Sequence, residues 1–381
     1  MKSADSCLSR QFVKHACGSY SVVTGVNILH ELPGLLPKNL VSGRACIVAD
    51  TTVARLYEKT VSDILEKADI KMLPAFRFRP GEKSKSFSTL QRLLTHMASI
   101  GTLRNDFIVA LGGGVTGDLA GFAASIYMRG ISFIQIPTTL LAQADSSIGG
   151  KTAINLTQGK NLVGTFHAPE LVICDLKTLD TLSTRHIRNG LAEIIKMTII
   201  GDPECFEYLE QHARTITRKN NRHKLAYALK AACRLKCRIV EKDEKESGIR
   251  TWLNLGHTFG HAMECSAGYG KLMHGEAVGM GILAAGMLAV RLSICHPDDV
   301  ERIRSLLLQT GLPVRPPDLN LKDVMINMTL DKKNRSGLQR LVLPEKIGKV
   351  TLVDNVDRAT IEESIRTLMV IHRRSNQEIF E

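Results

Sequence analysis

The stretch FIVALGGGVTGDLAGFAASIYM, residues 107–128, decides the class of the fold. Its first part, FIVAL, is a short apolar run that ends at glycines, which is typical of a strand buried in a sheet. The apolar segment after the glycines has the length and composition of a helix. A strand that passes through a tight turn into a helix is the first half of a βαβ unit, so we expect a parallel sheet with crossover helices.

Strand and helix signals alternate on both sides of this stretch. ACIVA (45–49) and ISFIQI (131–136) predict two more strands, and residues 52–67 have helical periodicity. From about Leu179 the chain is predicted to be mostly helical, with helices near residues 185–200, 222–242, 255–267, 275–292 and 298–310. The composition changes near residues 175–184. We therefore expect an α/β fold, with an N-terminal Rossmann-like parallel-sheet domain over residues 1–178 and an all-α domain over residues 179–381.

Composition narrows the class of protein. The chain has 381 residues, enough for two domains, and its 44% apolar and 23% charged content is that of a globular protein. No segment reaches the roughly 20 apolar residues of a membrane span, and the N-terminal residues lack the apolar run of a secretory signal. Nine scattered cysteines predict reduced thiols rather than a disulfide framework. We expect a cytoplasmic protein that does not bind membranes.

The net charge of +12 raises the question of a nucleic-acid partner. The basic residues are dispersed, however, and aromatic residues make up only 5% of the chain, so stacking platforms for bases are scarce. A basic surface or a site for an anionic small molecule explains the charge equally well. We expect a small-molecule ligand and no nucleic acid.

The glycines after FIVAL form the pattern G-x-G-x-x-G between Gly112 and Gly117. Glycines at such a turn let the backbone approach a pyrophosphate, and the helix N-terminus attracts its charge. The acidic residue that usually binds the ribose at the end of the next strand is missing, because ISFIQI continues into PTT. The pattern predicts a phosphate-binding turn. A strand-to-helix turn that simply requires glycine remains the alternative.

A second group of residues has the character of a metal site. Glu193 lies in GLAEIIKM, His257 and His261 are four residues apart in GHTFGH, and His274 precedes another helix start. Two histidines and one carboxylate leave a coordination position open, which is the arrangement of catalytic rather than structural zinc. A histidine pair at this spacing is also often incidental, and spacing alone does not decide which histidines would be ligands.

A third group is a polar, glycine-rich run, DSSIGGK at residues 145–151, which continues to GKN at 159–161. Its position after a strand end is where open α/β sheets bind ligands, although an irregular surface loop is the alternative. Lys236, Arg250 and Asn254 add donors elsewhere in the chain. So many cationic and amide donors suit a phosphorylated or carboxylated, hydroxyl-rich substrate.

Taken in order, these motifs resemble those of 3-dehydroquinate synthases, members of the sugar-phosphate cyclase superfamily. The resemblance runs from about Tyr20 to Gly348, through GGGVTGDLAGFAASIYMRG, IPTTLLAQADSSIGGKTAIN, GKNLVGTFH, GLAEIIK, NLGHTFGH and HGEAV. It implies a carbon–oxygen lyase of the shikimate pathway, and so of aromatic amino acid and chorismate biosynthesis. Such enzymes convert 3-deoxy-D-arabino-heptulosonate 7-phosphate into 3-dehydroquinate and phosphate by NAD-mediated oxidation, phosphate elimination, re-reduction, ring opening and aldol closure. The implied cofactors are NAD and Zn²⁺, with Co²⁺ as an alternative.

The resemblance also implies roles for individual residues. The metal ligands would be Glu193, His257 and His274, so that His261 would be a phosphate-side histidine near Glu246. The NAD contacts would be Asp50, Glu82, Lys85, Gly114, Val115, Asp118, Thr138, Thr139, Lys151, Lys160 and Thr181. The substrate contacts would be Arg129, Asp145, Lys151, Asn161, Lys196, Lys236, Arg250, Asn254 and His261, with one of Lys332 and Lys333. The catalytic residues among these would be Lys151, Glu246, Arg250, Asn254 and His261.

Two domains and a dimer follow from the same resemblance. Residues 1–178 would bind NAD, and residues 179–381 would bind zinc and substrate. Arg129 would reach the phosphate bound by a neighbouring subunit, which implies a homodimer. One departure affects the nucleotide contacts, because Thr52 stands where many members of the family have Asn.

Three other functions remain as alternatives. A metal-dependent polyol dehydrogenase of the glycerol-dehydrogenase type would consume NAD stoichiometrically. Cyclases that form inosose or valiolone are nearer, but Lys236, Asn254 and NLGHTFGH favour dehydroquinate synthase. A basic nucleic-acid-binding protein would bind strands with a steep salt dependence and without any need for the histidines.

Overall fold

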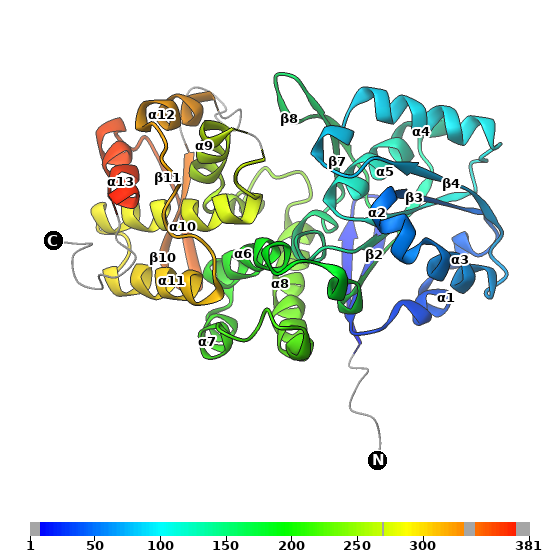
Figure 1. Cartoon of the computed structure of the whole chain (residues 1–381), viewed down its shortest axis with the longest axis horizontal. Coiled ribbons are helices and arrows are strands. Elements are labelled where there is room, and N and C mark those ends of the chain that lie inside the picture. The colour runs from blue at the N-terminus through cyan, green and yellow to red at the C-terminus, as the bar shows by residue number, and fades with distance from the viewer. Residues whose placement is uncertain (1–7, 269, 331–339, 371–381) are drawn as a thin grey trace, which may run out of the picture. The chain divides into compact units, whose positions relative to one another are not determined.

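The computed structural model describes residues 8–268, 270–330 and 340–370 (Figure 1). These residues form two compact units. The first unit runs to Leu182 and includes Lys236–Lys245, and the second comprises Ser183–Leu235 and the chain from Glu246 onward. Among the residues described, no helix is both long and apolar enough to cross a membrane.

A seven-stranded sheet forms the centre of the first unit, in the order β1-β2-β9-β6-β5-β3-β4. The strands are β1 (Ser9–His15), β2 (Gly18–Gly25), β3 (Ala45–Asp50), β4 (Met72–Phe78), β5 (Phe107–Gly112), β6 (Ser132–Pro137) and β9 (Leu171–Asp175). Neighbouring strands are parallel throughout, except for the antiparallel pair β1 and β2 at one edge. The parallel sheet expected from the FIVAL stretch is therefore confirmed.

Helices cover both faces of this sheet, which explains why β5 is apolar and buried at every position and why β3 and β6 are mostly apolar. Along β5, Phe107, Val109 and Leu111 join the core that contains α1 (Leu32–Leu35) and α3 (Lys59–Glu66). The alternate residues Ile108 and Ala110 join a second core. That core contains α4 (Phe87–Ser99) and α5 (Gly114–Ile126), which lie together in Figure 1.

Two local expectations for the first unit need correction. The helix expected over residues 52–67 is interrupted, and forms α2 (Thr51–Val53), the π-helical turn η3 (Ala54–Glu58) and α3. The polar run expected as a loop folds largely into an antiparallel hairpin of β7 (Lys151–Leu156) and β8 (Gly159–Phe166). The hairpin forms because Thr152 and Ile154 are buried and β7 packs on α5. Gly164 allows the close pairing, since a Cβ there would lie 1.9 Å from Thr152 O.

The second unit is mostly helical, as expected. Its helices are α6 (Thr184–Gly201), α7 (Pro203–His212), α8 (Arg222–Lys242, whose last part from Lys236 belongs to the first unit), α9 (His257–Ala267), α10 (His274–Arg291), α11 (Pro297–Thr310), α12 (Leu321–Leu330) and α13 (Arg358–Val370). The sequence did not predict the two-stranded ladder β10 (Arg340–Lys346) and β11 (Lys349–Asp354). Short helical turns complete both units: η1 (Leu29–Glu31), η2 (Lys38–Leu40), η4 (Glu82–Ser84), η5 (Tyr127–Arg129), η6 (Ala142–Ser146), η7 (Leu176–Thr181), η8 (Lys219–Asn221) and η9 (Ile249–Asn254).

Helices α9 and α10 pack backbone against backbone. Gly256, which precedes α9, has a left-handed φ of +77°. A Cβ on Gly281 of α10 would lie 2.0 Å from Gly256 O, and a Cβ on Gly260 would lie 2.8 Å from Ala277 O. Glycine is therefore required for this approach, and the rings of His257 and His274, the first residues of the two helices, have their centroids 5.2 Å apart.

Asp106 is the buried anchor of the turn before β5. Its side chain is 1% exposed and accepts hydrogen bonds from Arg44 N, Nε and Nη2 and from Leu103 N, at 2.6–3.1 Å. Burial raises the pKa of this carboxyl, but the bonds from Arg44 and Leu103 outweigh burial and hold its pKa below the ordinary value.

Replacing this carboxylate, as in Asp106→Asn, should lower the free energy of unfolding by about 2–3 kcal/mol, because buried donors lose their acceptor. A lowered native pKa stabilises the fold above the unfolded-state pKa of about 3.9, and this contribution is lost as the pH falls through the native pKa. Urea unfolding should therefore show a large difference from the parent at pH 7 and a smaller one below pH 4. Asp63→Asn, which breaks an exposed pair with Lys59, is the control and should change little. An equal loss for the two variants would contradict the prediction.

Candidate active site

The carboxyl edge of the sheet holds the residues expected at the nucleotide. The chain passes from β3 to β4 on one side and from β5 to β6 on the other, so the ends of β3 and β5 flank a switch point of the sheet. Open α/β sheets bind ligands at such points. Asp50 ends β3, and Gly114 begins α5 directly after β5. A Cβ on Gly114 would lie 2.9 Å from Ser146 Oγ, so glycine keeps this turn open.

Other residues expected at the nucleotide lie near the ends of elements in the same unit. Val115 is in the first turn of α5, Thr138 and Thr139 follow β6, Lys160 is exposed on β8, and Thr181 ends η7. The Asp50 carboxylate caps α2 by accepting from Thr52 N and Val53 N at 2.8 and 3.1 Å. Asp50 contacts position 52 through the backbone N–H, which every residue except proline has. Thr52 therefore allows the cap of α2 just as Asn would.

Lys85 is a buried cation at the centre of a polar network. Its side chain is 4% exposed, and its ammonium donates to Asp118 Oδ2 at 2.5 Å and to Asn161 Oδ1. Glu82 Oε1 lies 3.9 Å from the same ammonium. Burial raises the pKa of Asp118, and the charge of Lys85 partly opposes this shift. The structure thus brings together four of the predicted residues.

Sequence reasoning missed the role of Asn155 in this network. Its backbone N–H donates to Lys85 O at 2.8 Å, and its Nδ2 donates to Glu82 Oε1 at 2.7 Å. Its Oδ1 accepts from Asn161 N at 2.9 Å, where Asn161 has a left-handed φ of +56°. One side chain therefore ties the β7–β8 hairpin to the loop that carries Glu82 and Lys85. Only its place inside the polar run could have indicated it.

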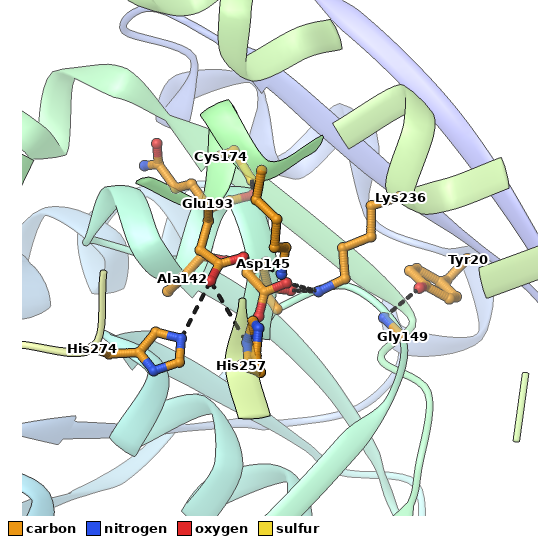
Figure 2. Close-up of polar contacts among 12 residues, drawn as sticks. Tyr20, Ala142, Asp145, Gly149, Cys174, Glu193, Lys236, His257 and His274 are labelled. Atoms are coloured by element: carbon orange, nitrogen blue, oxygen red, sulfur yellow. Dashed lines mark hydrogen bonds and ion pairs between the residues drawn. The ribbon is translucent and has the colours of Figure 1, made fainter. Parts of the chain in front are cut away.

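Asp145 and Lys236, both expected at the substrate, form a buried ion pair in the first unit. The Lys236 ammonium donates to the Asp145 carboxylate and, at 2.6 Å, to Asp145 O (Figure 2). The Lys236 side chain is only 6% exposed. The same segment is fixed at Gly149, whose N–H donates to Tyr20 Oη at 3.0 Å. The charge of Lys236 is thus held at a defined point.

Glu193, His257 and His274 form a cluster in the second unit, with one potential ligand atom from each within 4.8 Å of the others. Glu193 comes from the middle of α6, and the histidines are the first residues of α9 and α10. Glu193 Oε1 lies 3.2 Å from His274 Nε2 and 3.7 Å from His257 Nε2, and both rings point to this carboxylate in Figure 2. The Glu193 side chain is fully buried and pairs with Lys196.

These residues fit a divalent metal. His257 Nδ1 lies 3.2 Å from Leu255 O, an acceptor for a proton on Nδ1, and this arrangement directs Nε2 toward Glu193 as a metal ligand would be. Ligand histidines in metalloproteins are oriented by such bonds from the second ring nitrogen. Two imidazoles and a carboxylate make a three-ligand zinc site with room for a further ligand.

Several other residues predicted for the site of the second unit lie close to His257 in the sequence. Asn254 Nδ2 donates to Glu246 Oε1 at 2.9 Å, and Arg250 is 2% exposed. The His261 ring lies 5.3 Å from the His257 ring and 6.0 Å from the His274 ring, and His261 does not belong to the three-residue cluster. Lys332 and Lys333 lie outside the described residues.

Lys151 and Arg129, two further predicted residues of the first unit, are also exposed. Lys151 begins β7. Arg129 lies in the turn η5, where Met128, Arg129 and Gly130 have φ values of +48°, +66° and +120°. Three successive left-handed residues form a sharply bent and strained turn, which holds Arg129 at the surface.

Solved structures define the class of this fold. A 2-epi-5-epi-valiolone synthase from Streptomyces hygroscopicus subsp. jinggangensis, solved with NAD⁺ and Zn²⁺, is 30% identical, with a TM-score of 0.84 over 93% of this chain and 98% of its own. A 2-deoxy-scyllo-inosose synthase, solved with carbaglucose-6-phosphate, NAD⁺ and Co²⁺, is 26% identical, with a TM-score of 0.85 over 94% and 99%. The expected fold class is confirmed, and it is that of the sugar-phosphate cyclases.

Sequence comparisons narrow the class to one family. The 3-dehydroquinate synthase N-terminal family matches residues 75–189, and the 3-dehydroquinate synthase C-terminal family matches residues 190–334. A 3-dehydroquinate synthase of Nitrosospira multiformis is 45% identical over 352 residues, covering 90% of this chain and 93% of the relative. The chain belongs to the 3-dehydroquinate synthase family, which confirms the resemblance drawn from the motifs.

Proposed function

We propose that this chain is a lyase of the shikimate pathway that converts 3-deoxy-D-arabino-heptulosonate 7-phosphate into 3-dehydroquinate and phosphate. The observation that carries the proposal is the cluster of Glu193, His257 and His274 in a chain that matches the family over most of its length. The buried cations of both units support it, because an anionic substrate needs fixed donors.

Zn²⁺ fits the cluster of Glu193, His257 and His274, with Co²⁺ as an alternative, and NAD fits the switch point of the sheet. The related synthases were solved with NAD⁺ and with Zn²⁺ or Co²⁺. When bound, the metal polarises a substrate hydroxyl as a Lewis acid and the nicotinamide accepts and returns hydride. Lys85 and the glycines before α5 would hold the nucleotide, because helix N-termini and nearby cations attract its pyrophosphate. Asp118 would contribute to the same site by fixing the Lys85 ammonium, with which it pairs.

The chain's own residues would bind and orient a flexible polyanion. Lys236, Lys196 and Arg250 are almost completely buried, so their charges are poorly screened and fixed in position. Fixing a substrate in one reactive geometry supplies much of the rate of an enzyme. Asn254, held by Glu246, presents its amide in one orientation. His261 would donate to the phosphate side of the substrate instead of binding the metal, and exposed Lys151 would contact both substrate and nucleotide.

We also propose a cytoplasmic homodimer in which Arg129 contributes to the neighbouring subunit's site. Its turn is flanked by the exposed apolar side chains of Ile126 (41% exposed) and Met128 (42%). Exposed apolar side chains that lie together on a surface often mark protein–protein contacts, and these two flank Arg129.

One assay tests the function. Purified protein is mixed with the heptulosonate phosphate and NAD far below the substrate concentration, and released phosphate and absorbance of NADH are followed. We expect many phosphates per NAD, no lasting NADH, and loss of activity with a chelator. Glucose 6-phosphate should release no phosphate, which separates this function from inosose formation. Stoichiometric NADH would instead indicate a polyol dehydrogenase, and the absence of turnover would refute the proposal.

A further inference from the structure

Three polar residues of α6 lie on one face of that helix at intervals of four. They are Arg185, Asn189 and Glu193, and residues four apart in a helix are neighbours on its surface. Each of them contacts the start of α10. Glu193 lies 3.2 Å from His274 Nε2, as Figure 2 shows, so this face of α6 provides one proposed metal ligand and touches another. The other two residues contact the backbone and side chains on either side of His274.

Asn189 fixes the backbone directly after His274. Its Oδ1 accepts a hydrogen bond from Gly275 N at 2.6 Å, and the residue is only 6% exposed. The two backbones also touch, because a Cβ added to Gly275 would lie 2.0 Å from Asn189 O. The N–H of Gly275 is one of those that a helix N-terminus leaves without an internal partner. Asn189 therefore satisfies this donor and sets the distance between α6 and α10.

Arg185 lies one helical turn before Asn189 on α6 and also contacts the first turn of α10. Its Nε and Nη2 donate to the two carboxylate oxygens of Glu276 at 2.7 and 2.8 Å. Glu276 Oε2 also accepts from Met273 N at 2.9 Å. A two-point arginine–carboxylate contact defines an orientation as well as a distance. The residues before and after His274 are thus held through one carboxylate, which is only 13% exposed.

We propose that Asn189 and Arg185 are positioning residues for the metal, which act by holding His274 at a fixed distance from Glu193. Both ligands then depend on one rigid helix, since Glu193 is part of α6 and His274 is attached to it at two points. Groups that orient metal ligands are worth about 10–100-fold in metal affinity. This proposal rests on the proposed metal site and concerns its affinity and geometry rather than the reaction.

The test measures metal binding by the full chain. Zinc affinity is determined by competition with a chromogenic chelator, and the visible spectrum of the Co²⁺-loaded protein reports the coordination geometry. Asn189→Leu removes the acceptor at similar size and should weaken zinc binding about 10–100-fold and change the cobalt spectrum. Asn189→Asp keeps an acceptor oxygen and should restore both. Arg185→Met, at a more exposed position, should weaken zinc binding several-fold and still decides the question if Asn189→Leu does not fold.

Thr198→Val is the matched control. Thr198 is also buried in α6, and its hydroxyl donates to Ile195 O at 2.7 Å, so a buried hydrogen bond is lost on the same helix. This variant should bind zinc as the parent does. If the parent binds zinc and both Asn189→Leu and Arg185→Met bind it equally tightly with the parental cobalt spectrum, the positioning role is refuted while the proposed function stands. If the parent binds neither zinc nor cobalt, the proposed function fails and the positioning role fails with it.

Discussion

His274→Ala should lose zinc and catalytic activity together, with kcat/KM falling by roughly 10³-fold or more, because the metal supplies several kcal/mol of transition-state stabilisation. Removing His274 leaves Glu193 and His257, and two protein ligands are too few for a tight zinc site. Metal content by atomic absorption and phosphate release measured on the same preparation check this result.

His261→Ala is the matched control, because it removes an imidazole from the same helix as His257 without removing a residue of the cluster. This variant should keep one zinc per chain while phosphate elimination slows. Loss of zinc in His261→Ala, or retention of zinc in His274→Ala, would show that the ligand set is wrong. Equal metal content in the two variants cannot be reconciled with the proposed site.

Lys236→Met should have the second large effect, on both stability and activity. Removing the ammonium leaves the Asp145 carboxylate without its buried partner, which typically costs about 3–5 kcal/mol when the pair is fully buried. Asp145 is 25% exposed, so we expect the lower part of this range. Loss of a fixed donor to the substrate should also reduce kcat by about 10²–10³-fold. Urea unfolding and steady-state phosphate release measure the two effects separately.

The double variant Lys236→Met with Asp145→Asn separates stability from catalysis. Neutralising Asp145 removes the unpaired charge, so most of the lost stability should return, since both charges are gone. Activity should stay low, because neither substrate contact is restored. If activity recovers together with stability, Lys236 has only a structural role, and its assignment to the substrate is wrong.

Local patterns predicted the central strands and the long helices. The strands β3, β5 and β6 are mostly apolar because both faces of the sheet are covered, and such runs are visible in the sequence. Helices of the second unit such as α11 have apolar residues at helical spacing because one face of the helix is buried. The hairpin of β7 and β8 was missed because polar residues and glycines interrupt its apolar residues. It is stabilised by packing on α5, which is a tertiary effect that no local pattern contains.

The candidate site was predictable in kind but not in detail. Spacing indicated a metal site at His257, His261 and His274, and the family resemblance, not the spacing, excluded His261. Contacts such as that of Asn189 with Gly275 join residues 86 positions apart. They depend on how two helices pack, and neither residue type carries a signal of its own. The sequence therefore predicted the proposed metal ligands but not the residues that hold those ligands in position.

The packing of α9 on α10 has a consequence for how variation can accumulate in this chain. The spacing between the two proposed histidine ligands depends on the absence of side chains at Gly256, Gly260 and Gly281. These glycines allow the backbones of the two helices to contact each other. Even a single methyl group at Gly281, well away from His274 in sequence, would push the helices apart. Tolerance to substitution in the second unit is therefore governed by backbone separation, and positions with no chemistry of their own can be as constrained as the ligands.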